Sequence, residues 1–383
     1  MFVKHKFQEV ILNLRESKLI TLKLMQPQIS QLDFSGQNIY VGFDVHLKSW
    51  QVTVMTEQLT HKTFSQAPKP EVLQQYLRQH FPGGTYHSAY EAGFCGYWIH
   101  NQLAALGIDS MVVNPADIPT TDKEKVQKED ARDSRKIARS LRSGTLTPIH
   151  VPLAQTLEDR CLVRTRATLI KDLTRYKNRI KSFLYFHGIE LATPFTKIQT
   201  HWSKRFMTWL ENIDMPEQSS KMALQIMIAE ARHLRASVLQ LSRQLNALSK
   251  TTVYQQPVAL LRSIPGIGLL TAMTLLTELE RMDRFANMDQ LCSFIGLIPS
   301  THSSGEKEGT GDLTRRGHAV LRSALIESAW VAIRLDPALS KSYHEYCHRM
   351  EPNQAIVRIA RKLLSRIRYV LLNKQAYVCA VVH

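Results

Sequence analysis

Residues 39–50 read Ile-Tyr-Val-Gly-Phe-Asp-Val-His-Leu-Lys-Ser-Trp, an apolar strand pattern that carries an aspartate, Asp44, near its end. A short polar turn follows, and residues 51–54 read as a second strand. A carboxylate within a sheet is costly to desolvate unless it binds a cation or a strong hydrogen-bond donor. The plainer interpretation is a turn aspartate at a strand end. Further carboxylates downstream favour the cation.

The segments after this strand alternate between helix and strand. Helical spacing over residues 70–80 and 94–106 alternates with short strands at 86–90 and 109–113. This alternation predicts a three-layer α/β domain over residues 38–150. Glu91 directly follows one of these strands.

A highly charged segment, residues 120–143, has one apolar face and predicts an amphipathic helix. Asp130 and Asp133 are three residues apart, so on a helix they lie on one side and their side chains can converge. Acids at a helix start are also favoured by the helix dipole alone, and this second interpretation stays open.

Beyond residue 150 the sequence is mainly helical. Two long basic stretches, 157–186 and 221–248, predict an antiparallel coiled-coil arm over residues 151–252. A mainly helical carboxy-terminal domain is expected over residues 253–383. Within it, a Pro-Gly-Ile-Gly turn with Gly266 and Gly268 resembles a helix-hairpin-helix element, in which glycines let the backbone approach a phosphate. A tight turn between two packed helices is the alternative.

Residues 300–312 are rich in hydroxyl side chains and glycine, and we expect a loop there, followed by Arg315 and Arg316. A serine in such a loop, Ser303 or Ser304, has the chemistry to attack a phosphodiester, and guanidinium groups would stabilise the developing charge. A surface loop without chemistry is the alternative.

The composition points to a polyanionic partner. Lys and Arg number 49 against 33 Asp and Glu, for a net charge of +16, which favours nucleic acid first and a membrane surface second. No apolar segment approaches the ~20 residues that span a bilayer, and no signal-peptide pattern is visible. The five cysteines lack zinc or disulfide spacing, which predicts reduced thiols in a cytoplasm. Residues 1–37 are a polar extension without readable chemistry.

Three motifs together resemble a known family, the insertion-sequence one-hundred-and-ten family of DEDD transposases, which is related to the Piv-type DNA invertases. Their order covers nearly the whole chain from about residue 39. The motifs are Val41-Gly42-Phe43-Asp44-Val45-His46 with Lys48-Ser49-Trp50, then Lys128-Glu129-Asp130-Ala131-Arg132-Asp133, and last the set Pro265–Gly268, Gly296–Pro299, Ser303–Gly305 and Arg315–His318.

The resemblance implies a ribonuclease-H-like (RuvC-type) fold for the amino-terminal domain. It also implies that four acids gather on one or two Mg²⁺ ions, for which hard oxygen ligands are suited. The four acids are Asp44, Glu91, Asp130 and Asp133. The nucleic-acid contacts expected with this assignment are Lys48, Lys128, Arg132, Gly266, Gly268, Arg315 and Arg316.

The resemblance further implies a serine nucleophile that forms a transient phosphoserine link to DNA, with Ser303 preferred over Ser304. It implies donor and target double-stranded DNA, a structured noncoding guide RNA, and a tetramer built as a dimer of dimers through the arm. A cytoplasmic, nucleoid-associated location in a bacterium follows. Glu306 and Glu308 depart from the glycine or basic residues that relatives often carry there.

Three other activities remain open at this point. The first is a Piv-like invertase that works without a guide RNA. The second is a metal-dependent, resolvase-type nuclease that uses water in place of serine. The third is a nucleic-acid-binding relative without catalysis, which the presence of all four acids disfavours.

Overall fold

The computed structural model describes residues 33–119, 130–304, 307–314 and 316–379, and for residues 301–304 and 307–310 it describes the backbone alone. Two compact units follow one another along the chain, and the boundary lies between Val151 and Pro152. The expected polar extension up to residue 32, Lys128 and Arg315 lie outside the described residues.

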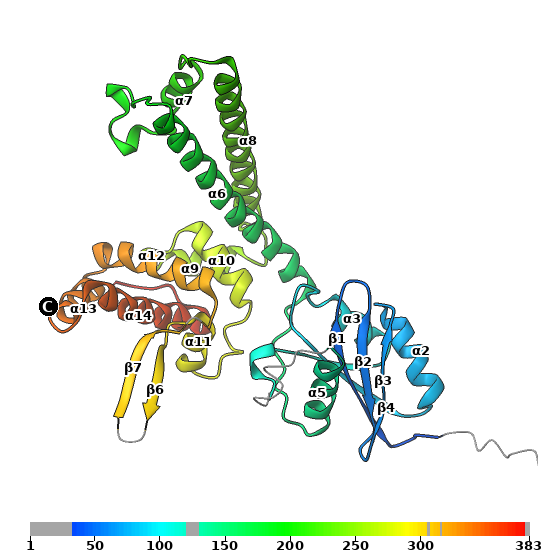
Figure 1. Cartoon of the computed structure of the whole chain (residues 1–383). Coiled ribbons are helices and arrows are strands. Elements are labelled where there is room, and N and C mark those ends of the chain that lie inside the picture. Colours follow the sequence, from blue (N-terminus) through cyan, green and yellow to red (C-terminus); the bar gives the residue numbers. More distant parts are fainter. Residues whose placement is uncertain (1–32, 120–129, 305–306, 315, 380–383) are drawn as a thin grey trace, which may run out of the picture. The chain divides into compact units, whose positions relative to one another are not determined.

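A five-stranded mixed sheet forms the centre of the first unit, in the order β3-β2-β1-β4-β5 (Figure 1). β1 pairs antiparallel with β2 and parallel with β4, while β2–β3 is antiparallel and β4–β5 is parallel. This arrangement is compatible with the expected ribonuclease-H-like fold. The strands are β1 (Asn38–Val45), β2 (Trp50–Met55), β3 (Thr60–Gln66), β4 (Thr85–Glu91) and β5 (Asp109–Val113).

Helices cover both faces of this sheet, which confirms the predicted layers (Figure 1). On one face Phe43 stacks on Trp50 and Tyr90, each with ring centroids 5.2 Å apart, below residues of two helices. Such aromatic pairs add about 1 kcal/mol each beyond the area they bury. The helices on this face are α2 (Pro70–His80) and α3 (Trp98–Ala105), and on the other face lies α5 (Asp130–Arg142). The 3₁₀ turn η1 (Pro115–Asp117) follows β5.

The second unit begins with a pair of long helices. Arg166 of α6 (Ala154–Phe186) donates to Ser242 of α8 (Gln218–Leu248), and further along Ile180 and Leu184 share a core with Ile228 and Leu224. Residues later in α6 therefore contact residues earlier in α8, so the two helices run antiparallel. Whether it packs as a coiled coil stays a prediction. The connection holds η2 (Thr193–Phe195), η3 (Ile198–Thr200) and α7 (Lys204–Glu211).

The remainder of the second unit is helical around one apolar core. The residues expected to form a loop at 300–312 instead form an antiparallel hairpin, β6 with β7, so that expectation is wrong. The segment is polar throughout, and without alternating apolar residues it gives no strand signal in the sequence. The elements are α9 (Gln255–Arg262), α10 (Leu269–Leu279), α11 (Met288–Ile295), β6 (Pro299–Ser304), β7 (Lys307–Leu313), α12 (Ala319–Leu335), α13 (Pro337–Cys347) and α14 (Pro352–Asn373).

No helix in the described ranges combines the length and the apolar character needed to cross a membrane.

Candidate active site

Asp44 lies near the carboxyl end of β1, the central strand of the sheet. The order of the sheet reverses here, because β2 and β3 extend to one side of β1 and β4 and β5 to the other. In open α/β sheets, ligands bind beyond the carboxyl ends of the strands at such a reversal point. Asp44 therefore occupies a position that the topology itself makes a candidate site.

Helix α5 approaches β1 unusually closely, and Gly42 is the reason. A Cβ atom at residue 42 would lie 2.2 Å from the backbone nitrogen of Ala138 and 2.4 Å from the carbonyl oxygen of Ser134. Only glycine permits such an approach of two backbones. A hydrogen bond of 2.9 Å between the buried hydroxyl groups of Thr53 and Ser134 fixes the helix over β2 as well.

This close contact determines where the first turn of α5 lies. Asp130 is one turn before Ser134 on the same helix face, and Asp44 is two residues beyond Gly42 on the same strand face. The contact at Gly42 therefore brings the two carboxylates, 86 residues apart in sequence, to one end of the sheet.

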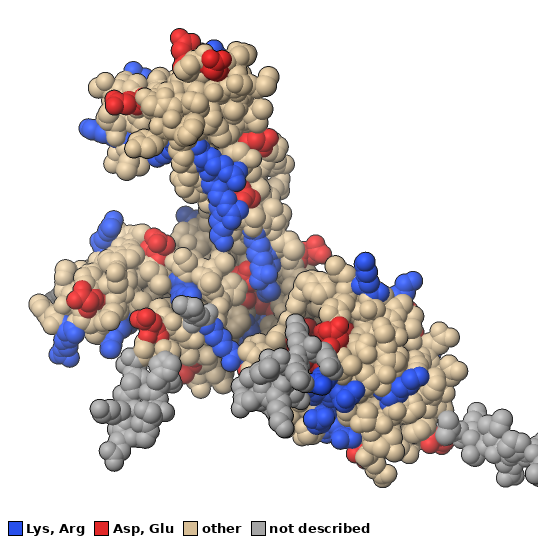
Figure 2. All heavy atoms as spheres, viewed as in Figure 1, with Lys and Arg blue, Asp and Glu red and all other residues tan. Residues whose placement is uncertain are grey.

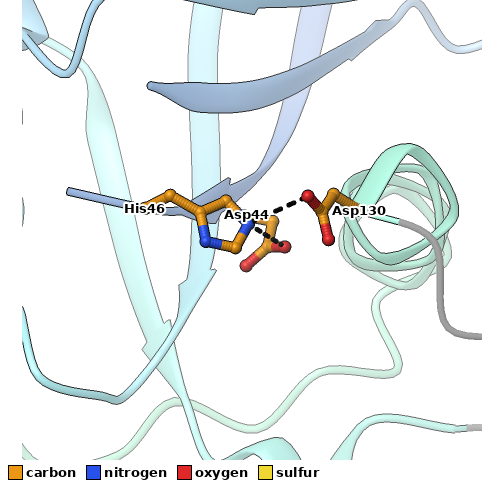
Figure 3. A group of neighbouring side chains, drawn as sticks. All are labelled: Asp44, His46 and Asp130. Atoms are coloured by element: carbon orange, nitrogen blue, oxygen red, sulfur yellow. Dashed lines mark ion pairs between the residues drawn. The ribbon is translucent and has the colours of Figure 1, made fainter. Parts of the chain in front are cut away.

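Asp44, His46 and Asp130 form a cluster whose potential ligand atoms all lie within 4.8 Å of one another (Figure 3). The Nε2 atom of His46 lies 3.1 Å from Oδ2 of Asp44 and 3.3 Å from Oδ2 of Asp130. Figure 3 shows the imidazole reaching from the end of β1 to both carboxylates, one from the strand and one from the helix. An N–H at this nitrogen can donate to either carboxylate, and the same three side chains could together hold a cation.

The electrostatics of the cluster leave Asp44 short of positive charge. Burial raises the pKa of Asp44 above its ordinary value, His46 lowers it, and the charges of Asp130 and Asp133 raise it again, so that the net shift is upward. Like-charged carboxylates at one site disfavour each other's ionised form. A divalent cation would remove this repulsion.

The other two expected acids are placed less directly. Asp133 lies in the first turn of α5, close enough to raise the pKa of Asp44, and its Oδ1 atom is 3.6 Å from Nζ of Lys136. Glu91 ends β4, and because Phe43 pairs with Tyr90, Glu91 is level with Asp44 on the neighbouring parallel strand. The carboxylates of Glu91 and Asp133 do not belong to the compact cluster of Figure 3.

The two candidate serines lie on β6, near the tip of the hairpin, where Ser303 pairs with Glu308 and Ser304 with Lys307. At the root, the Ser300 hydroxyl donates to the carbonyl of Asp312 (3.0 Å), and Arg322 donates to the carbonyl of Thr314 (2.7 Å). The hairpin therefore has a fixed base on the helical body.

The expected nucleic-acid contacts fall into two groups. Lys48 in the β1–β2 turn and Arg316 after the hairpin are exposed, Arg132 on α5 is half-buried, and Gly268 has open space where a side chain would be. Gly266 differs, because its Cβ would lie 2.3 Å from the carbonyl oxygen of Ser328 on α12. Gly266 therefore permits close packing against α12, as the tight-turn alternative expects, and a phosphate contact stays a prediction for all of these residues.

Sequence reasoning missed the roles of Gly42 and His46, although both stand in the first motif. A glycine inside an apolar strand signals a close backbone approach, and this signal was available. The position of His46 between two acids cannot be predicted from the sequence, because it depends on where α5 packs.

A second acid, Glu278 of α10, lies in very different surroundings. Its side chain is 2% exposed and accepts two hydrogen bonds from Arg164, at 2.7 and 2.8 Å, while Arg160 lies at 3.4 Å. His318 accepts from the amide of Leu321 through Nδ1, so its Nε2 donates to Glu278 at 3.1 Å. Burial acts to raise the pKa of Glu278, but the bonds and charges of Arg164 and His318 outweigh it and leave the pKa at about 2.

Two family models match this chain. Residues 41–188 match a DEDD transposase domain of IS110 type, and residues 258–345 match a model described as "Transposase IS116/IS110/IS902 family". The first contains Asp44, Glu91, Asp130 and Asp133, and the second contains the β6–β7 hairpin.

Individual proteins are similar over most of their length. The protein y4qE of Sinorhizobium fredii, which is named as a transposase, is 30% identical over 300 residues, covering 76% of this chain and 71% of its own. The transposase for insertion sequence element IS1533 of Leptospira borgpetersenii is 26% identical, covering 77% and 85%. The transposase for IS1111A of Coxiella burnetii is also 26% identical, covering 75% and 78%.

Proposed function

The chain belongs to the IS110/IS116 family of insertion-sequence transposases, and from this premise we propose that the acids of β1, β4 and α5 form the divalent-metal site at which it cuts and rejoins DNA. The observation that carries the proposal is the convergence of Asp44 and Asp130 on His46, at 3.1 and 3.3 Å. Residues from a central strand and a distant helix meet there without any structural need for two adjacent acids.

The donor set fits a hard divalent cation. Asp44 and Asp130 would hold it, with Asp133 and Glu91 completing the set, and carboxylate oxygens are the ligands that Mg²⁺ prefers. Burial, and after it the charges of Asp130 and Asp133, raise the pKa of Asp44, and a bound cation would stabilise its ionised form. His46 adds a nitrogen donor, which suits Mn²⁺ better than Mg²⁺, so both ions belong in a test. When bound, the metal would polarise the scissile phosphate.

In the proposed reaction a serine of the β6–β7 hairpin, Ser303 in preference to Ser304, is the nucleophile. Its oxygen forms a bond to phosphorus while a DNA hydroxyl leaves with a proton, and a hydroxyl of the second DNA strand later displaces the serine. Each step exchanges one phosphodiester for another, so no external energy source is needed. The alternative, a nuclease in which water attacks, predicts no covalent intermediate.

Nucleic-acid partners and self-association complete the proposal. Residues 154–248, which include α6 and α8, hold 15 Lys and Arg against 8 Asp and Glu, which supports binding of donor and target DNA or of a structured noncoding guide RNA. Three large apolar side chains at the end of α6 and in the connection to α8 are 77–88% exposed, namely Tyr185, Phe186 and Ile198. Exposed apolar surface of this kind supports assembly of a tetramer through the arm. Action on DNA in a bacterial cytoplasm, at the nucleoid, follows from this reading.

The test is strand cleavage and covalent capture with purified protein, DNA containing the ends of the element, and Mg²⁺ or Mn²⁺. Asp44→Asn and Asp130→Asn should each abolish cleavage, whereas Glu71→Gln, an exposed acid on α2, should not. Ser303→Ala or Ser304→Ala should abolish the protein–DNA adduct. Cleavage that survives both serine changes supports the water-dependent nuclease, and full activity of Asp44→Asn removes the acid site from the mechanism.

Sequencing of the RNA that co-purifies with the protein separates the guided recombinase from a Piv-like invertase. Enrichment of one RNA encoded beside the gene supports guidance. Recombination by protein that carries no specific RNA supports the invertase.

A further inference from the structure

A basic groove of about 1010 Å³ lies beside the root of the β6–β7 hairpin. One wall consists of the strand ends near Pro299 and Leu313, and the other consists of α14 and the end of α13. All of α14 lies outside the two family-model matches, the later of which ends at residue 345. We call the four cations that line this space, Arg349, Arg358, Arg361 and Lys362, the groove cations.

Three of the four groove cations are placed by the helical repeat of α14. The buried stripe of this helix, which includes Ile359 and Leu363, faces the core, so Arg358, Arg361 and Lys362 share the opposite, solvent-facing side. Gln354 lies one turn earlier along the same side and also lines the groove. A row of guanidinium, ammonium and amide groups one helical turn apart is suited to successive phosphates of a nucleic-acid backbone.

An aromatic ring holds two of these cations in position. Arg358 lies 5.7 Å and Lys362 lies 5.3 Å from the centre of the Tyr346 ring, and Lys362 also donates to the hydroxyl of Ser342 at 2.9 Å. Cation–π contacts at exposed sites contribute only about 0.5–1 kcal/mol, so they orient the two side chains and leave their charges available to a ligand.

The groove carries an excess of positive charge. Among the lining residues that the structure describes, Asp312 is the only carboxylate, against four cations. Within the described part of the chain, Arg361 has an ion pair with Asp289 at 3.5 Å, whereas Arg358 and Lys362 have no carboxylate within 4 Å. Unpaired cations gathered in a concave surface attract a polyanion and raise its local concentration.

The position beside the hairpin indicates which polyanion is involved. From the root at Pro299 to Ser303 and Ser304 the strand rises ~3.4 Å per residue, or about 15 Å in all. Duplex DNA rises ~3.4 Å per nucleotide, so this length corresponds to about four nucleotides. We propose that the groove between α14 and the hairpin root binds the phosphate backbone of the DNA strand that the hairpin serine attacks, about four nucleotides from the scissile phosphate. The position of the DNA strand relative to the serine rests on the proposed function, whereas binding of DNA in the groove does not.

Binding is tested in full-length protein carrying Ser303→Ala and Ser304→Ala, in buffer without divalent ions, so that neither serine nor metal-dependent hydrolysis cuts the DNA. The added pair Arg358→Gln and Lys362→Gln removes two groove cations, and the control pair Arg262→Gln and Lys341→Gln removes two exposed cations elsewhere in the same unit. The probe is a fluorescent 30-bp DNA duplex of random sequence, measured by anisotropy over a range of NaCl concentrations. Circular dichroism and the thermal midpoint show that each protein is folded.

The groove pair should reduce the slope of log K against log[NaCl] by about 1.8, since each lost phosphate contact contributes about 0.9. The control pair should change it by much less, and the swap Arg358→Lys with Lys362→Arg should restore binding because it keeps both charges. Equal effects of the groove pair and the control pair overturn the proposal. A loss confined to an RNA duplex of the same length, with DNA unaffected, also overturns it in favour of an RNA site.

The distance is tested separately with serine-containing protein and cleavable DNA that carries one neutral methylphosphonate linkage at successive positions. Adduct formation should fall most when the neutral linkage lies about four nucleotides from the cut, and this minimum should vanish in the groove pair. A flat profile overturns the placement. If no adduct forms with any DNA, the proposed serine chemistry fails, while the anisotropy measurement still decides whether the groove binds DNA.

Discussion

Asp44 and Glu278 are both partly or fully buried acids, yet their surroundings have opposite effects on them. Glu278 is enclosed by Arg160, Arg164 and His318, and its pKa falls to about 2. Burial raises the pKa of Asp44, and one imidazole does not offset it because Asp130 and Asp133 add to the increase. Glu278, whose negative charge is compensated by its neighbours, has a structural role. Asp44, whose charge is not compensated, is suited to bind an added cation. The number of compensating cations, more than burial, separates the two roles.

Loss of the Glu278 carboxylate should have the largest effect on stability. Glu278→Gln leaves Arg160 and Arg164 without their anion, and breaking such a buried pair typically costs about 3–5 kcal/mol. Urea unfolding should therefore show a strongly lowered midpoint. Glu71→Gln on the surface of α2 is the matched control and should stay within about 0.5 kcal/mol of wild type. A Glu278→Gln protein as stable as wild type would show that the network contributes nothing.

Acid pH should remove this difference. Because the pKa of Glu278 is lowered in the folded state from an ordinary 4.5 to about 2, its contribution is present above pH 4.5 and is lost as the pH falls through about 2. The contribution is on the order of 3 kcal/mol at neutral pH. The stability gap between wild type and Glu278→Gln should accordingly narrow between pH 4.5 and 2 in urea titrations. A gap independent of pH would contradict the assignment of charge.

Asp44→Asn should separate activity from stability. Cleavage should fall about 10²-fold or more, as for loss of one group that stabilises a transition state. The free energy of unfolding should not fall, because the raised pKa means that ionised Asp44 destabilises the fold above its ordinary pKa of 3.8, and the penalty disappears below it. Kinetics and thermal unfolding of the same sample test both points. A protein that loses activity and stability together would place Asp44 with the structural acids.

Gly42→Ala tests how the acid pair is assembled. A methyl group would overlap the backbone of α5, so the helix has to move, at about 1–3 kcal/mol or more. Cleavage should fall as well, since Asp130 moves with the helix. Gly144→Ala, at a turn with a positive φ but open space around it, controls for the general effect of replacing glycine. Equal activity losses in Gly42→Ala and Gly144→Ala would show that the contact between α5 and β1 does not determine the activity of the site.

Divalent ions should stabilise the wild type slightly. At ten times its Kd, a bound ion contributes about 1.4 kcal/mol, which raises the thermal midpoint. The same ion should leave Asp44→Asn and Asp130→Asn unchanged, and should still stabilise Glu278→Gln. A shift of equal size in all four proteins would indicate binding away from the acid cluster.

Most of the framework follows from the sequence, because long periodic segments report directly on packing. The strand at 109–113 and the helix at 70–80 have the bounds that their patterns predict, and the helix expected at 157–186 begins at Ala154. The hairpin of β6 and β7 could not be predicted, because its polar residues give no two-residue apolar repeat.

The site is less predictable than the framework. The carboxylates themselves were visible as acids at the ends of elements. That Asp44 and Asp130 meet through His46, while Glu91 and Asp133 lie outside the compact cluster, depends on where α5 packs. Glu278 was overlooked because an acid near the end of an apolar helix resembles any terminal charge until its partners on α6 and α12 are known.

The backbone contact at Gly42 has a consequence for redesign. Because glycine has no side chain, any substitution at residue 42 can only push α5 away from β1 and so widen the gap between the two carboxylates. Engineers who wish to retune ion preference would therefore have to vary the helix, at Ser134 or Ala138. Natural diversity in this spacing should likewise arise on the helix side.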